Sequence, residues 1–103
     1  MEITIKMATP KRIKKITGEL FEAHGYQFCI GFTEDRLAGI ELSTGQNAVC
    51  SDNYYTRDKI KYLIREKSKD QFDKAVKHAI ENIENKYHYP FPLNEKVIIL
   101  SNK

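Results

Sequence analysis

The residues best suited to chemistry in this 103-residue chain are lysines and arginines set close together beside tyrosines. The run RDKIKYLIREKSK, residues 57–69, carries them at short intervals. Cationic side chains on one exposed face neutralise phosphates, while aromatic rings stack on bases or pack against a partner. We therefore predict a partner-binding surface formed by Arg57, Lys59, Lys61, Tyr62, Arg65, Lys67 and Lys69, together with Tyr54 and Tyr55.

The same run has a simpler interpretation. Helices often carry several lysines for solubility alone, and Asp58 and Glu66 offset part of the positive charge. A second group of cations crowds the N-terminal segment, at Lys6, Lys11, Arg12, Lys14 and Lys15. The net charge is only +3, so the distribution of charge is more informative than its sum. The residues leave open whether the partner is nucleic acid or an acidic protein surface.

Signatures of catalysis and of metal binding are missing from the sequence. The three histidines lie far apart, without cysteine or histidine partners at metal-ligand spacing. No G-x-S-x-G elbow and no phosphate-binding loop is present. The carboxylate pairs Glu34–Asp35 and Glu81–Glu84 fall in a polar turn and on a polar helix face, whereas acid–base work needs burial. We predict a protein that is not an enzyme and needs no cofactor or metal.

Composition and cysteine usage point to one cytoplasmic domain spanning residues 1–103. No apolar run approaches the roughly eighteen residues of a membrane span, and the N-terminus lacks the apolar core of a signal peptide. Cys29 and Cys50 stand singly in the apolar contexts QFCIG and NAVCS, which predicts reduced, buried thiols.

A long helix is predicted from Ser68 to about Tyr87. Ser68 and Gln71 have the spacing of a capping box. Apolar residues then recur at three- and four-residue steps and form one stripe: Phe72, Ala75, Val76, Ala79, Ile80 and Ile83. We expect this stripe to cover one face of a sheet.

The first half of the chain is predicted to supply that sheet, since residues 2–7, 26–32 and 37–42 read as strands and 48–50 as a short one. Lys11 to His24 is ambiguous. It is a helix if Thr9 is its N-cap, or a strand if His24-Gly25 is a hairpin turn. We favour the strand, because Gly18 inside a helix would cost about 1 kcal/mol relative to alanine.

Three further segments complete the expected architecture. Residues 51–56 read as a loop, and Thr56 is the expected N-cap of a shorter basic helix that buries Ile60, Leu63 and Ile64 and ends near Lys67. The proline-rich segment YHYPFPL should fold back on the core with its aromatic rings, or present them to a partner. Residues 96–100, KVIIL, read as a last strand. The fold class is thus α+β, a small antiparallel sheet packed against a long C-terminal helix plus a shorter basic helix.

Part of the chain resembles known families. Thr17-Gly18, Glu19 to Phe21, His24-Gly25, residues 26–32 and Glu41 to Gly45 look like small phage and plasmid accessory proteins, with a glycine-turn hairpin and a "TG" turn. The whole chain is also similar in kind to anti-CRISPR proteins of Gram-positive mobile elements. This resemblance implies inhibition of a host CRISPR effector complex by surface binding. Those proteins share no motif, so it implies no residue roles.

Two other functions remain open. If Lys11 to His24 were helical, the chain would be similar to a double-stranded RNA-binding domain, whose last helix presents lysines to phosphates. The sequence departs from that family, because it lacks the glycine-proline-histidine turn and its basic cluster precedes Ser68. The third alternative is a regulatory protein-interaction domain. A homodimer through an uncovered sheet edge is open too.

Overall fold

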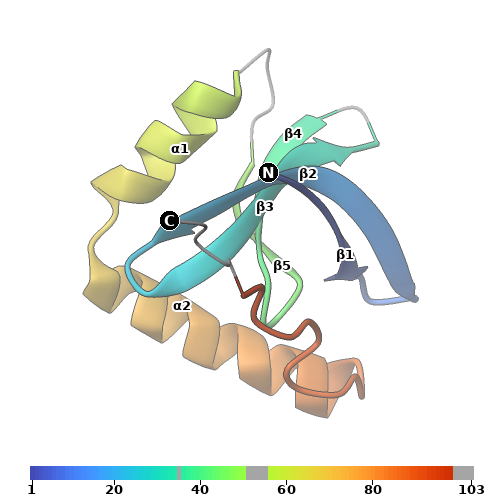
Figure 1. The fold of residues 1–103 in the computed structure, drawn as a ribbon. Coiled ribbons are helices and arrows are strands. Elements are labelled where there is room, and N and C mark those ends of the chain that lie inside the picture. Colours follow the sequence, from blue (N-terminus) through green and yellow to red (C-terminus); the bar gives the residue numbers. More distant parts are fainter. Residues whose placement is uncertain (35, 51–55, 99–103) are drawn as a thin grey trace.

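The computed structural model describes residues 1–34, 36–50 and 56–98 (Figure 1). Their strands form one antiparallel sheet in the order β1-β2-β3-β4-β5. These strands are β1 (Glu2–Ala8), β2 (Ile13–Ala23), β3 (Tyr26–Thr33), β4 (Arg36–Glu41) and β5 (Gln46–Cys50). The helices that follow are α1 (Arg57–Glu66) and α2 (Lys69–Glu81), and α2 continues into the π-helix η1 (Asn82–Lys86). The α+β class is therefore confirmed.

The ambiguous segment after Pro10 is a strand, as favoured from the sequence. β2 pairs with β3 through a tight turn at His24 and Gly25, whose φ angles are 57° and 82°. Positive φ at both central residues is the geometry of a type I′ hairpin turn, which suits the twist of the flanking strands. The helix-first order that a double-stranded RNA-binding domain requires is consequently not the order of this chain.

Two glycines allow the sheet to curl. Gly18 of β2 and Gly31 of β3 are register partners, and a Cβ on Gly18 would lie 2.2 Å from the carbonyl oxygen of Ile30. Only glycine tolerates so close a backbone approach. The curl brings β1 to the β4–β5 turn, where the Ala8 N–H donates to the Gly45 carbonyl at 2.8 Å.

The concave face of the curled sheet is apolar and is crossed by the C-terminal segment. Its buried cluster combines β1 with β4 and contains Ile5, Ile16, Cys29, Ala38, Ile40 and Leu42. The Gln27 side chain accepts from the Val97 N–H at 2.7 Å and donates to its carbonyl at 2.8 Å. The Asn94 amide accepts from the Lys6 N–H and donates to the carbonyls of Lys6 and Leu42, each at 2.8 Å.

The predicted C-terminal strand is wrong for residues 96–98, and residues 99–100 lie outside the described part of the chain. The physical reason is visible in the contacts of Val97. Its backbone groups bind the side chain of Gln27, whereas a strand would form a ladder with the backbone of a neighbouring strand.

Helix α1 covers the convex face. Ile60 and Ile64 are fully buried against Phe28, Ile30, Leu37 and Val49. Gly39 of β4 makes room for them, since a Cβ there would lie 3.0 Å from Ile64 Cδ1. The predicted N-cap is confirmed: the Thr56 hydroxyl accepts from the Lys59 N–H at 3.2 Å.

Helix α2 begins with the predicted capping box, but its predicted packing over the sheet is not confirmed. Figure 1 shows α1 beside the sheet and α2 running across the strand ends. Phe72 joins α2 to the core under α1, and Ile83 of η1 packs with Ala8 and Leu93. The α-helical part ends at Glu81, and the last turn is π-helical. Neither helix in the described residues is long and apolar enough to cross a membrane.

The aromatic tail folds back as expected. The Tyr87 and Tyr89 rings lie 5.7 Å apart and pack on the cluster around Ile83. The Tyr89 hydroxyl donates to the Thr9 carbonyl. Phe91 stays 41% exposed.

Candidate functional site

Two basic residues of α1, Arg57 and Lys61, form ion pairs with carboxylates of the sheet. The Arg57 guanidinium lies 3.2 Å from the Glu2 carboxylate and 3.7 Å from that of Glu19. The Lys61 ammonium also pairs with Glu19 and lies 5.9 Å from the centre of the Phe21 ring. These contacts join α1 to β1 and β2 on the convex face.

The pKa shifts of these side chains agree with the contacts. The hydrogen bond from Lys61 holds the pKa of Glu19 below its usual value, against the opposing effect of burial. The Glu2 carboxylate raises the pKa of Arg57. Arg57 and Lys61 therefore serve as structural partners of β-strand carboxylates.

The cations at the start of α2 follow the same pattern. Lys69 lies 3.1 Å from the Asp73 carboxylate, which also accepts from the Tyr26 hydroxyl at 2.5 Å. Burial, assisted by this bond, raises the pKa of Tyr26 to about 12. The Tyr26 and Lys69 hydrogen bonds lower the pKa of Asp73. Lys67 lies 5.9 Å from the Phe72 ring centre.

The other predicted residues lie on the outer side of α1. The Arg65 guanidinium lies 5.1 Å from the Phe21 ring centre. The Lys59 ammonium lies 5.0 Å from the Tyr62 ring centre, and a hydrogen bond with Glu66 raises the pKa of Tyr62. Tyr54 and Tyr55 lie outside the described residues. The described residues of the prediction thus form a strip along α1 and into the start of α2, in which Arg57, Lys61 and Lys69 pair with carboxylates.

A second cationic surface, at the β1–β2 hairpin, holds charges without such partners. Lys6, Lys11, Arg12 and Lys15 have no acidic group within 4 Å in the described part of the chain. Lys14 pairs with Glu34 at 3.2 Å. The crowding of these cations is visible in the sequence, but only the fold shows which of them have an acidic partner among the described residues.

The strand register places part of this group on the convex face, beyond the end of α1. Alternation puts Thr4 and Lys6 of β1 on the same side as Glu2, which contacts α1. The same rule puts Lys15 and Thr17 of β2 beside Glu19 and Phe21, and Phe32 of β3 beside Phe28 and Ile30. We name this surface the β1–β3 platform; its members, all exposed, are Thr4, Lys6, Lys15, Thr17 and Phe32.

Contacts on the platform agree with the register. The Thr4 and Thr17 hydroxyls are 2.7 Å apart, and Lys6 is the direct cross-strand partner of Lys15. A hollow of about 200 Å³ at the edge of the platform is lined by Lys15 and Phe32, and also by residues of the opposite face and the β3–β4 turn, among them Met7, Lys14, Ile16 and Glu34. Phe32 remains 67% exposed.

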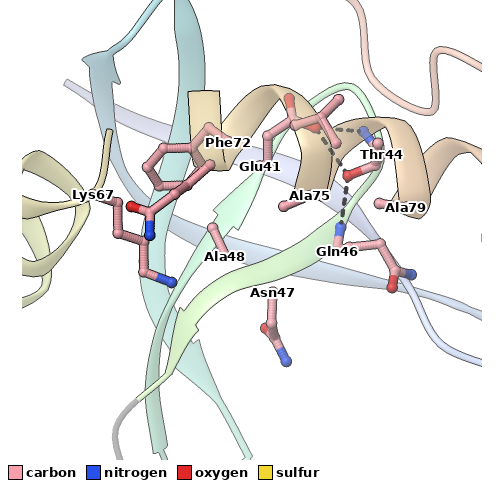
Figure 2. Close-up of a pocket in the computed structure, with 11 residues that line it drawn as sticks. Glu41, Thr44, Gln46, Asn47, Ala48, Lys67, Phe72, Ala75 and Ala79 are labelled. Atoms are coloured by element: carbon pink, nitrogen blue, oxygen red, sulfur yellow. Dashed lines mark hydrogen bonds between the residues drawn. The ribbon is translucent and has the colours of Figure 1, made fainter. Parts of the chain in front are cut away.

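A pocket of about 130 Å³ lies between α2 and the β4–β5 hairpin. Figure 2 shows its small walls, Ala75 and Ala79 of α2 and Ala48 of β5. The buried Glu41 carboxylate beside it accepts from the backbone N–H groups and hydroxyls of Ser43 and Thr44. This carboxylate is therefore occupied in holding the turn.

In the described part of the chain, His24 and Cys29 have packing positions in the core, and Cys50 lies at the surface. His24 Nε2 hydrogen-bonds the Ile64 carbonyl at 3.0 Å, and its ring stacks on Phe72. Cys29 is buried as predicted, whereas the prediction for Cys50 is wrong because it is exposed on the edge strand β5. No cluster of three or more potential metal ligands occurs among residues 1–34, 36–50 and 56–98.

Comparison with known proteins adds no assignment: no family model, curated protein or solved structure matches this chain.

Proposed function

We propose that the chain is a non-enzymatic binding protein that holds an anionic macromolecule on the β1–β3 platform. The observation that carries this proposal is the exposed pair of Lys6 and Lys15, direct register partners on one face, beside the solvent-exposed Phe32. Like charges directly opposite each other in a sheet are unfavourable by a few tenths to about 1 kcal/mol. An anion bound between them would remove that repulsion.

The α1 surface supports this function less well. A phosphate or carboxylate approaching Arg57 or Lys61 would compete with Glu2 and Glu19, which already hold those cations. Lys6, Lys11, Arg12 and Lys15 have no such competitor in the described residues, whereas Lys14 is paired with Glu34. Arg65 and Lys67 remain available as peripheral contacts of a large partner.

Inhibition of a host defence complex is the narrower role within this proposal. A CRISPR effector carries a guide RNA, and phosphates of such an RNA would suit Lys6 and Lys15, which have no acidic partner among the described residues. A regulatory interaction with an acidic protein would use the same surface.

Elution from a heparin column tests the platform with a polyanion of defined chemistry. The variant K6E/K15E removes the proposed contacts, and K77E/K86E makes the same change of net charge on the exposed side of α2 and η1. We expect K6E/K15E to elute at much lower salt than K77E/K86E, which should stay closer to the wild type. Equal shifts for the two variants would mean that only net charge matters, and the platform would be rejected.

A further inference from the structure

We infer that the anionic partner is a single-stranded nucleic acid, with an unpaired base stacked on Phe32 and the adjoining phosphates at Lys6 and Lys15. This inference rests on the proposed function and specifies its partner. It depends on the placement of one exposed aromatic ring and two cations that have no acidic partner among the described residues, all on the same face of the sheet.

Phe32 is the first part of the argument. The preceding residues with the same orientation, Phe28 and Ile30, are fully buried in the cluster with Ile60 and Ile64 of α1, whereas Phe32 lies outside that cluster and is 67% exposed. Because most of the Phe32 ring is exposed to solvent, it contributes little to the packing of the core. Aromatic rings on exposed sheet faces are platforms for bases, and they tolerate any sequence because every base has a flat face.

The cations lie where the backbone of a stacked nucleotide would pass. Gly18 of β2 and Gly31 of β3 are register partners in an antiparallel pair. The residue before Gly18, Thr17, is therefore opposite the residue after Gly31, Phe32. Lys15 is two residues farther along β2, which is about 7 Å of strand. Lys6 is its partner on β1, so the ring and both ammonium groups share one surface.

The surroundings favour a strand that runs from the platform toward the hairpin tip. Lys11 and Arg12 extend the cationic surface in that direction. Toward α1 the same face carries Glu2 and Glu19, held by Arg57 and Lys61, and this end would not attract phosphates. Glu34, in the β3–β4 turn, is paired with Lys14.

Other anionic partners use these features less fully. The bases of a duplex are stacked inside the helix and cannot reach the ring of Phe32. An acidic peptide or a sulfated polysaccharide would pair with the lysines but leave the ring without a flat partner. A single-stranded nucleic acid can do both, because its phosphates pair with the lysines and an unpaired base stacks on the Phe32 ring.

Tryptophan fluorescence gives a direct test, because the chain contains no tryptophan. Phe32→Trp places a single reporter on the platform, and Tyr62→Trp places a matched one on α1, where Tyr62 is 45% exposed. Both are titrated with a thymidine oligonucleotide of about 15 nucleotides, a length within the usual range of single-strand binding sites. We expect saturable quenching of Phe32→Trp and unchanged emission from Tyr62→Trp. Quenching of Tyr62→Trp instead would transfer the site to α1 and overturn the inference.

Affinity measurements by fluorescence polarisation with a labelled oligonucleotide separate stacking from charge. Phe32→Val keeps a strand-forming residue without the ring, and it should weaken oligonucleotide binding by about tenfold or more while leaving heparin binding unchanged. The variant K6Q/K15Q should lower the slope of log affinity against log salt by about 1.4, the value for two phosphates on a single strand. A duplex of equal length should bind more weakly than the single strand.

Failure of the inference and failure of the proposed function give different results. If Phe32→Val leaves oligonucleotide affinity unchanged, or if duplex and single strand bind equally, single-strand recognition is overturned while polyanion binding on the platform stands. If the wild type binds neither oligonucleotide nor heparin at about 50 mM salt, where phosphate contacts are strong, both proposals fall.

Discussion

Lys6 of β1 and Lys15 of β2 are direct partners in the antiparallel register, with their side chains on the same exposed face of the sheet. Replacing one of them should therefore stabilise the free protein. We expect Lys15→Gln to raise the free energy of unfolding by about 0.2–1 kcal/mol, measured by urea denaturation at low salt. Lys15→Arg keeps the repulsion and serves as the control. Because salt screens exposed charges, a gain that persists at high salt would contradict this explanation.

The close approach of β2 and β3 predicts a large difference between two glycine substitutions. A Cβ on Gly18 would meet the Ile30 carbonyl oxygen at 2.2 Å, so Gly18→Ala should destabilise by about 3 kcal/mol or more. A Cβ on Gly39 would meet Ile64 Cδ1 at 3.0 Å, the movable end of a side chain, and we expect a loss near 1 kcal/mol. Urea denaturation of both variants gives the order, and a reversed order would refute the packing argument.

Gln27 should control the attachment of the C-terminal segment. Its buried side chain makes two hydrogen bonds with the backbone of Val97, and Gln27→Leu removes both. We expect faster hydrogen exchange at the Val97 N–H and a loss of about 1–3 kcal/mol if the segment stays in place without partners. Amides of the β2–β3 ladder serve as the internal reference. An unchanged exchange rate at Val97 would show that another contact holds the segment.

The lowered pKa of Glu19 predicts an acid-sensitive contribution to stability. The pKa of Glu19 in the folded state lies below its usual value, because Lys61 donates a hydrogen bond to the carboxylate. The contribution is therefore present above the unfolded-state pKa and is lost as the pH falls through the folded-state pKa. Glu19→Gln should therefore destabilise at neutral pH, and its difference from the wild type should shrink in acid. Glu84→Gln, on the exposed side of η1, is the control for removing a surface carboxylate. A difference that is independent of pH would contradict the role of the Lys61 contact.

The two cysteines should differ sharply toward iodoacetamide. Cys29 is fully buried, and burial raises the pKa of its thiol to about 11, so little reactive thiolate forms. Cys50 is exposed. We expect one adduct per native molecule, located at Cys50 by mass spectrometry, and two after unfolding. Modification of native Cys29 without loss of fold would contradict the buried position.

Local features were predictable because they depend on neighbours in the sequence. The capping box at Ser68 and Gln71 and the N-cap at Thr56 need only a spacing of three residues, and both are present. Strand alternation likewise located β1, β3 and β4. The choice of strand for Lys11 to His24 was right because Gly18 is a poor helix residue and His24-Gly25 a good turn.

Packing partners were not predictable, because periodicity shows that a face is buried but not what buries it. The apolar stripe of α2 predicted that this helix would cover the sheet, but the shorter α1 packs there. Ile60 and Ile64 of α1 lie over Gly39, which has no side chain to obstruct them. The apolar sequence KVIIL suggested a strand, but Gln27 of β3, seventy residues away, takes up the backbone of Val97.

The candidate site shows the same division. Two groups of cations are evident from the sequence, one in residues 57–69 and one near the N-terminus. Which of these cations pair with carboxylates follows only from the tertiary structure, because an ion pair depends on the distance between segments that are far apart in the chain. Folding brings Glu2 and Glu19 to Arg57 and Lys61. The same register sets Lys6 against Lys15 and leaves Phe32 beyond the end of α1, where no local pattern could have placed it.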